Sequence, residues 1–261
     1  MVPPLVRQAF RGAGFAALTL GAGSGVFAQV TLARSDLDKS RARDRWSAGW
    51  SRALLDLFGV EVVVHGDPGV PGVGRGRGRV VVANHRSIID IAILLSLFGG
   101  ALLSRGDLER WPIIGRAAKS AGTIFVDRAS KKSGARAIEA MVARLAAHDT
   151  ICLFPEGTTF VDDEVRPFKA GACVAATRAE VPVIPVALVY PEGSGAAFGG
   201  ETFPQHLARL ADTRRTRVRV EIGQAMEKAD GETVPDFTER CRAEVARLIG
   251  AVRAEERLGP A

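Results

Sequence analysis

From residue 80 onward, short apolar runs alternate with longer stretches of helical periodicity, and this alternation constrains the fold more than any other feature of the chain. Such an order implies βαβ units around a mostly parallel sheet, because a parallel strand needs a crossover helix to return to the same edge. We predict strands at 80–83, 101–104, 122–126 and 151–154, with helices at 87–98, 107–121 and 133–148.

The last third of the chain continues this pattern. We predict a helix at 171–180, strands at 181–190 and 217–222, and a final amphipathic helix at about 235–252. Pro182 and Pro185 are expected to break the first of these strands. Residues 66–78 are rich in glycine and proline and predict a linker or turn. The predicted fold class is α/β, with a mostly parallel central sheet flanked by helices over residues 61–261 and a helical appendage over residues 1–60.

The first third of the chain predicts a membrane-associated segment. Residues 12–33 carry no charged side chain, which is about the length of a membrane-spanning helix, although five glycines dilute the apolar run. We favour a membrane-embedded or re-entrant helix, with a cleaved signal peptide or an ordinary buried helix as alternatives. Trp46 and Trp50 follow at helical spacing with basic neighbours. This pattern is typical of a helix at a bilayer interface and, equally, of one packed on the main domain.

Charge and composition narrow the class of partner. The formal net charge of +6 and the pI near 9.7 suit an anionic membrane or a phosphorylated substrate. Aromatic residues make up only 6% of the chain and we find no nucleic-acid recognition motif, so a nucleic acid is not an expected partner. The four histidines lack the spacing of a metal site, so no metal is predicted. The three separated cysteines predict buried free thiols in a reducing compartment.

Two short motifs follow predicted strands. The first, at residues 84–90, places His85 five positions before Asp90. With His85 just before a helix and Asp90 in its first turn, the carboxylate can orient the imidazole as a general base. The alternative is a capping box, in which Ser87 caps the helix and Asp90 answers it.

The second motif, Phe-Pro-Glu-Gly-Thr-Thr at residues 154–159, places Glu156 on a turn between proline and glycine. Its carboxylate can accept hydrogen bonds from a polyol, and a plain turn that closes a strand is the alternative. Arg128 follows another predicted strand, and Lys169 lies just before a predicted helix. Both are candidate cations for a phosphate group.

The motifs occur in a specific order. The blocks His-x-x-x-x-Asp, Gly-x-Ile-Phe-Val-Asp-Arg, Phe-Pro-Glu-Gly-Thr and Val-Pro-Val-Ile-Pro-Val resemble the four signature blocks of the glycerolipid acyltransferases, and in particular the 1-acyl-sn-glycerol-3-phosphate acyltransferase branch. The resemblance covers roughly residues 79–223. It implies that His85 is the general base and that Asp90 is its orienting carboxylate.

The resemblance also implies binding roles. It assigns acceptor binding to Arg128, Glu156, Gly157, Thr158 and Lys169, and the acyl-donor pocket to Val181, Pro182, Ile184 and Pro185. One residue departs from the pattern, because relatives commonly carry a basic residue where this chain has Thr159. Less positive charge therefore lies near the acceptor site.

Together these residues predict a membrane-bound O-acyltransferase. His85 would take a proton from a lyso-lipid hydroxyl while the oxygen attacks the thioester of acyl-CoA or acyl-carrier protein, with no cofactor. The favoured acceptor is 1-acyl-glycerol-3-phosphate, which gives phosphatidic acid, and Thr159 motivates a lyso-amino-acid lipid as the alternative. A catalytically silent, basic membrane-binding protein is the alternative from another class. Because acyl thioesters are made inside the cell, the expected location is the cytoplasmic face of the inner membrane.

Overall fold

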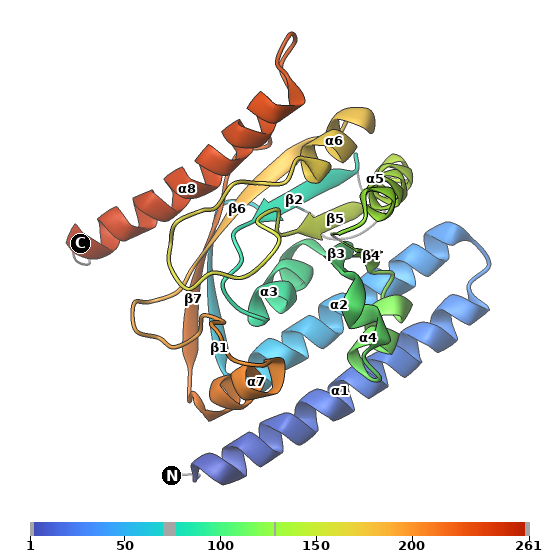
Figure 1. Ribbon diagram of the computed structural model, residues 1–261. Coiled ribbons are helices and arrows are strands. Elements are labelled where there is room, and N and C mark those ends of the chain that lie inside the picture. Colours follow the sequence, from blue (N-terminus) through green and yellow to red (C-terminus); the bar gives the residue numbers. More distant parts are fainter. Residues whose placement is uncertain (1–2, 70–76, 128, 259–261) are drawn as a thin grey trace.

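The computed structural model describes residues 3–69, 77–127 and 129–258. At its centre lies a seven-stranded sheet with the order β1-β7-β6-β2-β5-β3-β4 (Figure 1). The strands are β1 (Val60–His65), β2 (Arg79–Ala83), β3 (Ala101–Arg105), β4 (Ile124–Val126), β5 (Thr150–Leu153), β6 (Val183–Val189) and β7 (Thr216–Ile222). The helices are α1 (Pro4–Leu32), α2 (Asp36–Phe58), α3 (Ile89–Phe98), the 3-10 helix η1 (Gly106–Arg110), α4 (Ile114–Ser120), α5 (Lys131–Ala146), α6 (Gly171–Arg178), α7 (Phe203–Asp212) and α8 (Val234–Leu258).

The pairing of the strands brings the two sequence motifs together. Neighbouring strands of this sheet are parallel except β6 and β7, which confirms the predicted α/β fold with a mostly parallel sheet. β2 lies between β5 and β6, with Val82 opposite Leu153 and Pro185. Because parallel strands end at one edge, the residues that follow β2 and β5 emerge side by side.

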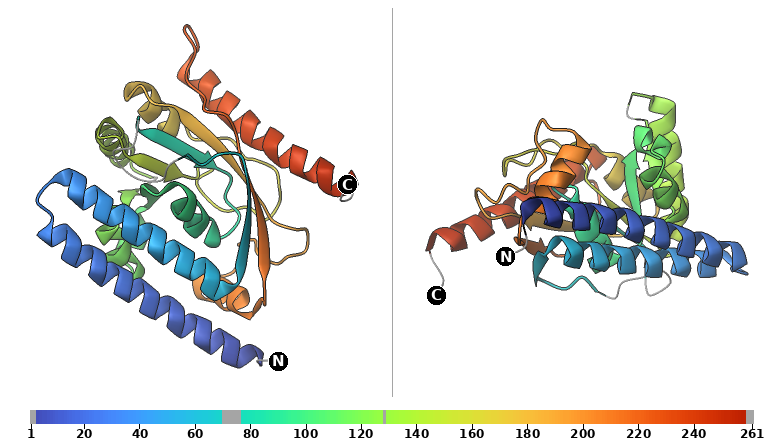
Figure 2. Two further views of the ribbon diagram at one scale, coloured as in Figure 1. Left: turned by 180° about the vertical axis from the view of Figure 1, so that it is seen from behind. Right: turned by 90° about the horizontal axis from the view of Figure 1, so that it is seen from below.

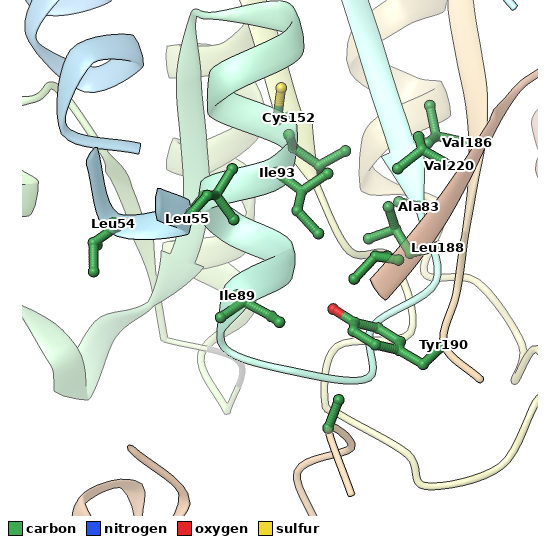
Figure 3. Packing of buried hydrophobic residues seen from close by; sticks show 14 of the residues in the cluster. Leu54, Leu55, Ala83, Ile89, Ile93, Cys152, Val186, Leu188, Tyr190 and Val220 are labelled. Atoms are coloured by element: carbon green, nitrogen blue, oxygen red, sulfur yellow. The ribbon is translucent and has the colours of Figure 1, made fainter. Parts of the chain in front are cut away.

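Helices cover both faces of the sheet. Val81 and Ala83 of β2 pack into a core with α2 and α3, whereas Val80 and Val82 pack into a second core with α5 and α6. Figure 3 shows part of the first core, with Leu55 and Ile93 on one side of it and Val186 and Leu188 on the other. A strand buried on both faces has no polar alternation, which explains why the predicted strands have unbroken apolar sequences.

The helices α1 and α2 form a hairpin that packs directly on the α/β fold (Figure 2). Within the hairpin, Trp50 Nε1 donates a hydrogen bond of 3.1 Å to Thr19 Oγ1. Arg11, which is 8% exposed, donates to carbonyls at the end of α7, including that of Thr213 at 2.5 Å. The helix α1 is long and apolar enough to cross a membrane. One side of it remains exposed, with Leu5, Val6, Phe10, Leu20, Phe27 and Leu32.

Proline explains two differences from the predicted elements. The helix expected at 107–121 is divided into η1 and α4, because Pro112 has no N–H to donate and restricts the residue before it. The strand β6, in contrast, continues through Pro185. The carbonyl of Pro185 accepts from Gly223 N at 2.8 Å, one position beyond the last pair of the β6–β7 ladder, so the missing N–H falls at the end of that ladder.

Two elements were not predicted. β1 is a strand of β-branched residues at the edge of the sheet, and α7 begins with a capping box between Thr202 and Gln205. Both signals are present in the sequence, but each is short and isolated. Of the predicted linker at 66–78, residues 70–76 lie outside the described part of the chain.

Candidate active site

His85 and Asp90 meet at the edge where β2 ends. His85 lies on the connection from β2 to α3, and Asp90 lies in the first turn of α3. His85 Nδ1 and Asp90 Oδ2 are 2.9 Å apart. The five-residue spacing therefore forms a contact because only Asp90 is helical, as the base hypothesis required.

Asp90 is a buried carboxylate with several donors. It is 0% exposed, and its Oδ2 also accepts from the backbone N–H of Arg86 at 2.7 Å and of Ser87 at 2.8 Å. The Tyr190 hydroxyl donates to the other oxygen, Oδ1. The capping-box alternative is thus half correct. Asp90 accepts from backbone N–H groups just before the helix, but the Ser87 hydroxyl faces His206 and does not cap the helix. One side chain serves both functions.

The imidazole of His85 has one free edge. Its ring stacks on Phe154 at 3.9 Å between centroids with an interplanar angle of 9°, so the second motif supports the first. Because Nδ1 donates to a carboxylate, Nε2 is the acceptor, and it has no hydrogen-bond partner among the residues that the structure describes. His85 lines a cavity. A held imidazole with an open Nε2 can take a proton from a bound hydroxyl.

Glu156 does not reach that cavity. Its side chain is 0% exposed, and it accepts from His85 N at 3.0 Å and from the Arg86 guanidinium at 3.3 Å. Burial raises the pKa of the Glu156 carboxyl, and the positive charge of Arg86 lowers it in part. The expectation that Glu156 contacts the acceptor is not supported by this placement, because its oxygens already hold the loop that carries His85.

Other predicted binding residues do lie at the cavity. Gly157 and Thr158 line it, together with Thr159. Gly157 has φ +86°, and a Cβ there would come within 2.9 Å of Lys169 Nζ, so Lys169 lies against this turn. Arg128 lies outside the part of the chain that the structure describes.

The cavity itself is apolar and encloses about 410 Å³, within the range of roughly 300–1,000 Å³ that is usual for ligand pockets. It extends from His85 beneath the N-terminal hairpin. Side chains of the hairpin, α3, α4 and the adjacent strands form its wall, including Phe15, Val26, Trp46, Trp50, Leu54, Ile89, Ala92, Leu95, Leu102, Ile114, Ala117 and Phe125.

The block expected to form the acyl-donor pocket lies elsewhere. Ile184 and Pro185 belong to β6 in the middle of the sheet, and Val181 and Pro182 lie just before it. The cavity wall includes none of the four. Their apolar character reflects burial in the sheet, and the apolar wall of the pocket comes mainly from the N-terminal hairpin, α3 and α4.

Several polar residues that hold the site were not predicted from the sequence. Tyr190 donates directly to Asp90, whereas His206, which lies against Glu201, connects to Asp90 through Ser87. The sequence signal for them is weak. Tyr190 is the single tyrosine of the chain and ends an apolar run, and His206 lies in a segment without a motif. Among the residues described, no group of three His, Cys, Asp or Glu side chains is arranged to hold a metal ion.

Comparison with known proteins is consistent with this geometry. A family model described as "Acyltransferase" matches residues 61–189. The lyso-ornithine lipid O-acyltransferase of Pseudomonas aeruginosa is 32% identical over 226 residues, which cover 84% of this chain and 83% of that protein. The chain belongs to the glycerolipid acyltransferase family.

Other acyltransferases support the same assignment. The 1-acyl-sn-glycerol-3-phosphate acyltransferase of Neisseria meningitidis serogroup B is 28% identical over 203 residues, covering 74% of this chain and 77% of that protein. The crystal structure of PlsC, the 1-acyl-sn-glycerophosphate acyltransferase from Thermotoga maritima, has the same fold, with a TM-score of 0.74, 21% identity and 96% of each chain covered. As an acyltransferase of this family, the chain is an O-acyltransferase.

Proposed function

We propose that this acyltransferase transfers a fatty acyl group from acyl-CoA or acyl-carrier protein to the free hydroxyl of a membrane lyso-lipid. One observation carries the proposal. The imidazole of His85, held at Nδ1 by a buried carboxylate, lines a large apolar cavity. A general base beside a lipid-sized apolar space suits acyl transfer between two hydrophobic substrates.

The proposed reaction needs no enzyme nucleophile and no cofactor. Nε2 of His85 takes the hydroxyl proton as the oxygen attacks the thioester carbonyl. When the tetrahedral intermediate collapses, the C–O bond remains, the C–S bond breaks, and the thiolate leaves with the proton. The oxyanion requires a donor, and the N–H groups of Arg86 and Ser87 are already used by Asp90. Thr158, on the cavity side of the Gly157 turn, is the donor that we assign to it.

The apolar cavity would hold the acyl chain, which gives a prediction for chain length. Ala92, on α3, is 4% exposed and lines the cavity. We expect Ala92→Phe to fill part of this space and to lower kcat/KM for a palmitoyl donor by about tenfold, the lower end of the effect of a small mismatch in a hydrophobic pocket. An octanoyl donor measured on the same preparation is the control, because its rate should stay near that of the wild type. Equal losses with both donors would contradict this use of the cavity.

The acceptor has two candidates. The first is 1-acyl-glycerol-3-phosphate, whose phosphate would face Lys169 beside Gly157. The second is a lyso-amino-acid lipid, whose carboxylate would use the same cation. Thr159 favours the second candidate because it supplies no charge, and so do the relatives named lyso-ornithine lipid O-acyltransferases in Pseudomonas aeruginosa and in Rhizobium meliloti, at 32% and 31% identity.

A panel of donors and acceptors tests the function and the role of Thr159 together. Purified protein should acylate at least one of the two lyso-lipids from an acyl thioester. Thr159→Arg should raise kcat/KM for the phosphate acceptor by about fivefold, because one added charge pair near the surface contributes about 1 kcal/mol. Thr177→Arg, on α6 away from the cavity wall, is the control for added charge. No transfer to any acceptor would reject the proposed function.

The exposed apolar side of α1 supports a membrane location. Six large apolar side chains lie exposed on this helix while its other side packs on α2, α4 and α7. Because the cavity runs beneath the same hairpin, a lyso-lipid could enter from the bilayer without crossing water. We place the enzyme on the cytoplasmic face of the inner membrane, where acyl thioesters are available.

A further inference from the structure

Asp90 is held by a residue that follows β6, the strand next to β2 in the sheet. Tyr190, directly after β6, is the only tyrosine of the chain and is 6% exposed. Its hydroxyl donates to Asp90 Oδ1, and Figure 3 shows it pointing toward the beginning of α3. Burial and the charge of Asp90 hold the pKa of Tyr190 well above its usual value, so the phenol remains a neutral donor.

Asp90 is also connected to α7. The backbone N–H of Ser87 donates to Asp90 Oδ2 at 2.8 Å, and the Ser87 Oγ lies 3.2 Å from Nε2 of His206. His206 is 0% exposed, and its Nδ1 lies 2.7 Å from Oε1 of Glu201. Burial lowers the pKa of His206. The Arg209 guanidinium lies 2.8 Å from the same Nδ1, and the other ring nitrogen, Nε2, faces the Ser87 hydroxyl.

We propose that Tyr190, Ser87 and His206 form a positioning relay that fixes Asp90 in the orientation it needs to hold His85. This inference rests on the proposed function, since it assigns these residues to the same reaction. The cavity wall includes none of the three, so they act on the reaction only through Asp90. They are positioning residues and contact no substrate.

The relay has a physical reason. Asp90 is 0% exposed, and a buried carboxylate needs hydrogen-bond donors on both oxygens because an unsatisfied buried charge is costly. With one oxygen unsatisfied, the side chain can rotate toward another donor. Oδ2 has His85 and two backbone amides, whereas Tyr190 is the donor at Oδ1. Without Tyr190, Asp90 would lose its alignment with His85 Nδ1. The chemical step would then slow while the binding of both substrates stayed the same.

Kinetics on Tyr190→Phe test the first link. With palmitoyl-CoA and 1-oleoyl-glycerol-3-phosphate, we expect kcat to fall by about tenfold, the effect of one hydrogen bond to a charged group, with both KM values within about twofold. Thr238→Val is the matched control, because it removes another buried hydroxyl, one that bonds within α8 at 2.8 Å. A fall in kcat of less than about threefold, or an equal fall for Thr238→Val, would overturn the inference.

The single tyrosine supplies a second readout that needs no turnover. Tyrosine labelled with ¹³C at Cζ should give one resonance, and Ser87→Ala and His206→Leu should both move it, whereas Thr238→Val should not. His206→Gln, which restores a polar group facing Ser87, should bring the resonance and kcat back toward the wild type. If the resonance keeps its wild-type position in both Ser87→Ala and His206→Leu, the relay is rejected. If no variant and no wild-type protein transfers acyl groups, the proposed function fails and the resonance still decides the relay.

Discussion

Replacement of His85 by alanine is expected to lower kcat for acyl transfer by about 10²–10⁴-fold, the usual contribution of a general base. The reason is the geometry at Nε2, which is the free nitrogen of an imidazole that Asp90 holds at 2.9 Å. Without it, the lyso-lipid hydroxyl would attack while still protonated. KM should change little, because His85 is one of many residues that line the cavity. The measurement is steady-state acyl transfer by purified protein.

His65 provides the control for this substitution. It lies at the end of β1 with a side chain that is 48% exposed, and its nearest acid, Glu221, is 3.8 Å away. His65→Ala should therefore leave kcat unchanged. Circular dichroism and thermal unfolding should show both variants folded. Acyl transfer by a folded His85→Ala variant within tenfold of the wild type would contradict the assignment of the base.

The sequence predicted the fold and the centre of the site because both depend on local patterns. Apolar runs buried on both faces identified the strands, and the motif at 84–90 placed His85 before the helix and Asp90 within it. The motif at 154–159 lies close to the motif at 84–90 because β5 and β2, the strands that precede them, are neighbours in the sheet. Parallel strands that end at one edge made this a reasonable expectation, although spacing along the chain does not fix strand order.

What the sequence could not predict depends on long-range contacts. Tyr190 reaches Asp90 across 100 positions, and Ser87 reaches His206 across 119. The contact between Glu156 and Arg86 was not foreseen for the same reason, because the two residues lie 70 positions apart. An acidic residue on a Pro-Gly turn looks available to a ligand until the strand order shows what it faces. The sequence could not show that residues 181–185 lie outside the cavity wall, because a buried strand and a pocket wall have the same apolar composition.

Glu156→Ala is expected to lower the free energy of unfolding by about 3–5 kcal/mol, the cost of leaving a buried charge without its partner. Arg86 is 2% exposed, and its guanidinium faces the Glu156 carboxylate at 3.3 Å. Since burial raises the pKa of Glu156 despite this pair, the carboxylate itself gains little from burial, and most of the cost should come from the abandoned guanidinium. Urea unfolding followed by tryptophan fluorescence measures the loss.

Two further variants show whether the buried pair is the cause. Glu156→Gln keeps an oxygen for the N–H of His85 and for Arg86, so its loss should be clearly smaller than that of alanine. Glu139→Ala breaks an Arg–Glu pair on the surface, where Arg178 and Glu139 are 47% and 63% exposed, and should cost less than about 1 kcal/mol. Glu156→Gln should also retain more acyl transfer than Glu156→Ala, because the loop that carries His85 keeps its anchor. Equal losses of stability for Glu156→Ala and Glu139→Ala would show that Glu156 does not hold this loop.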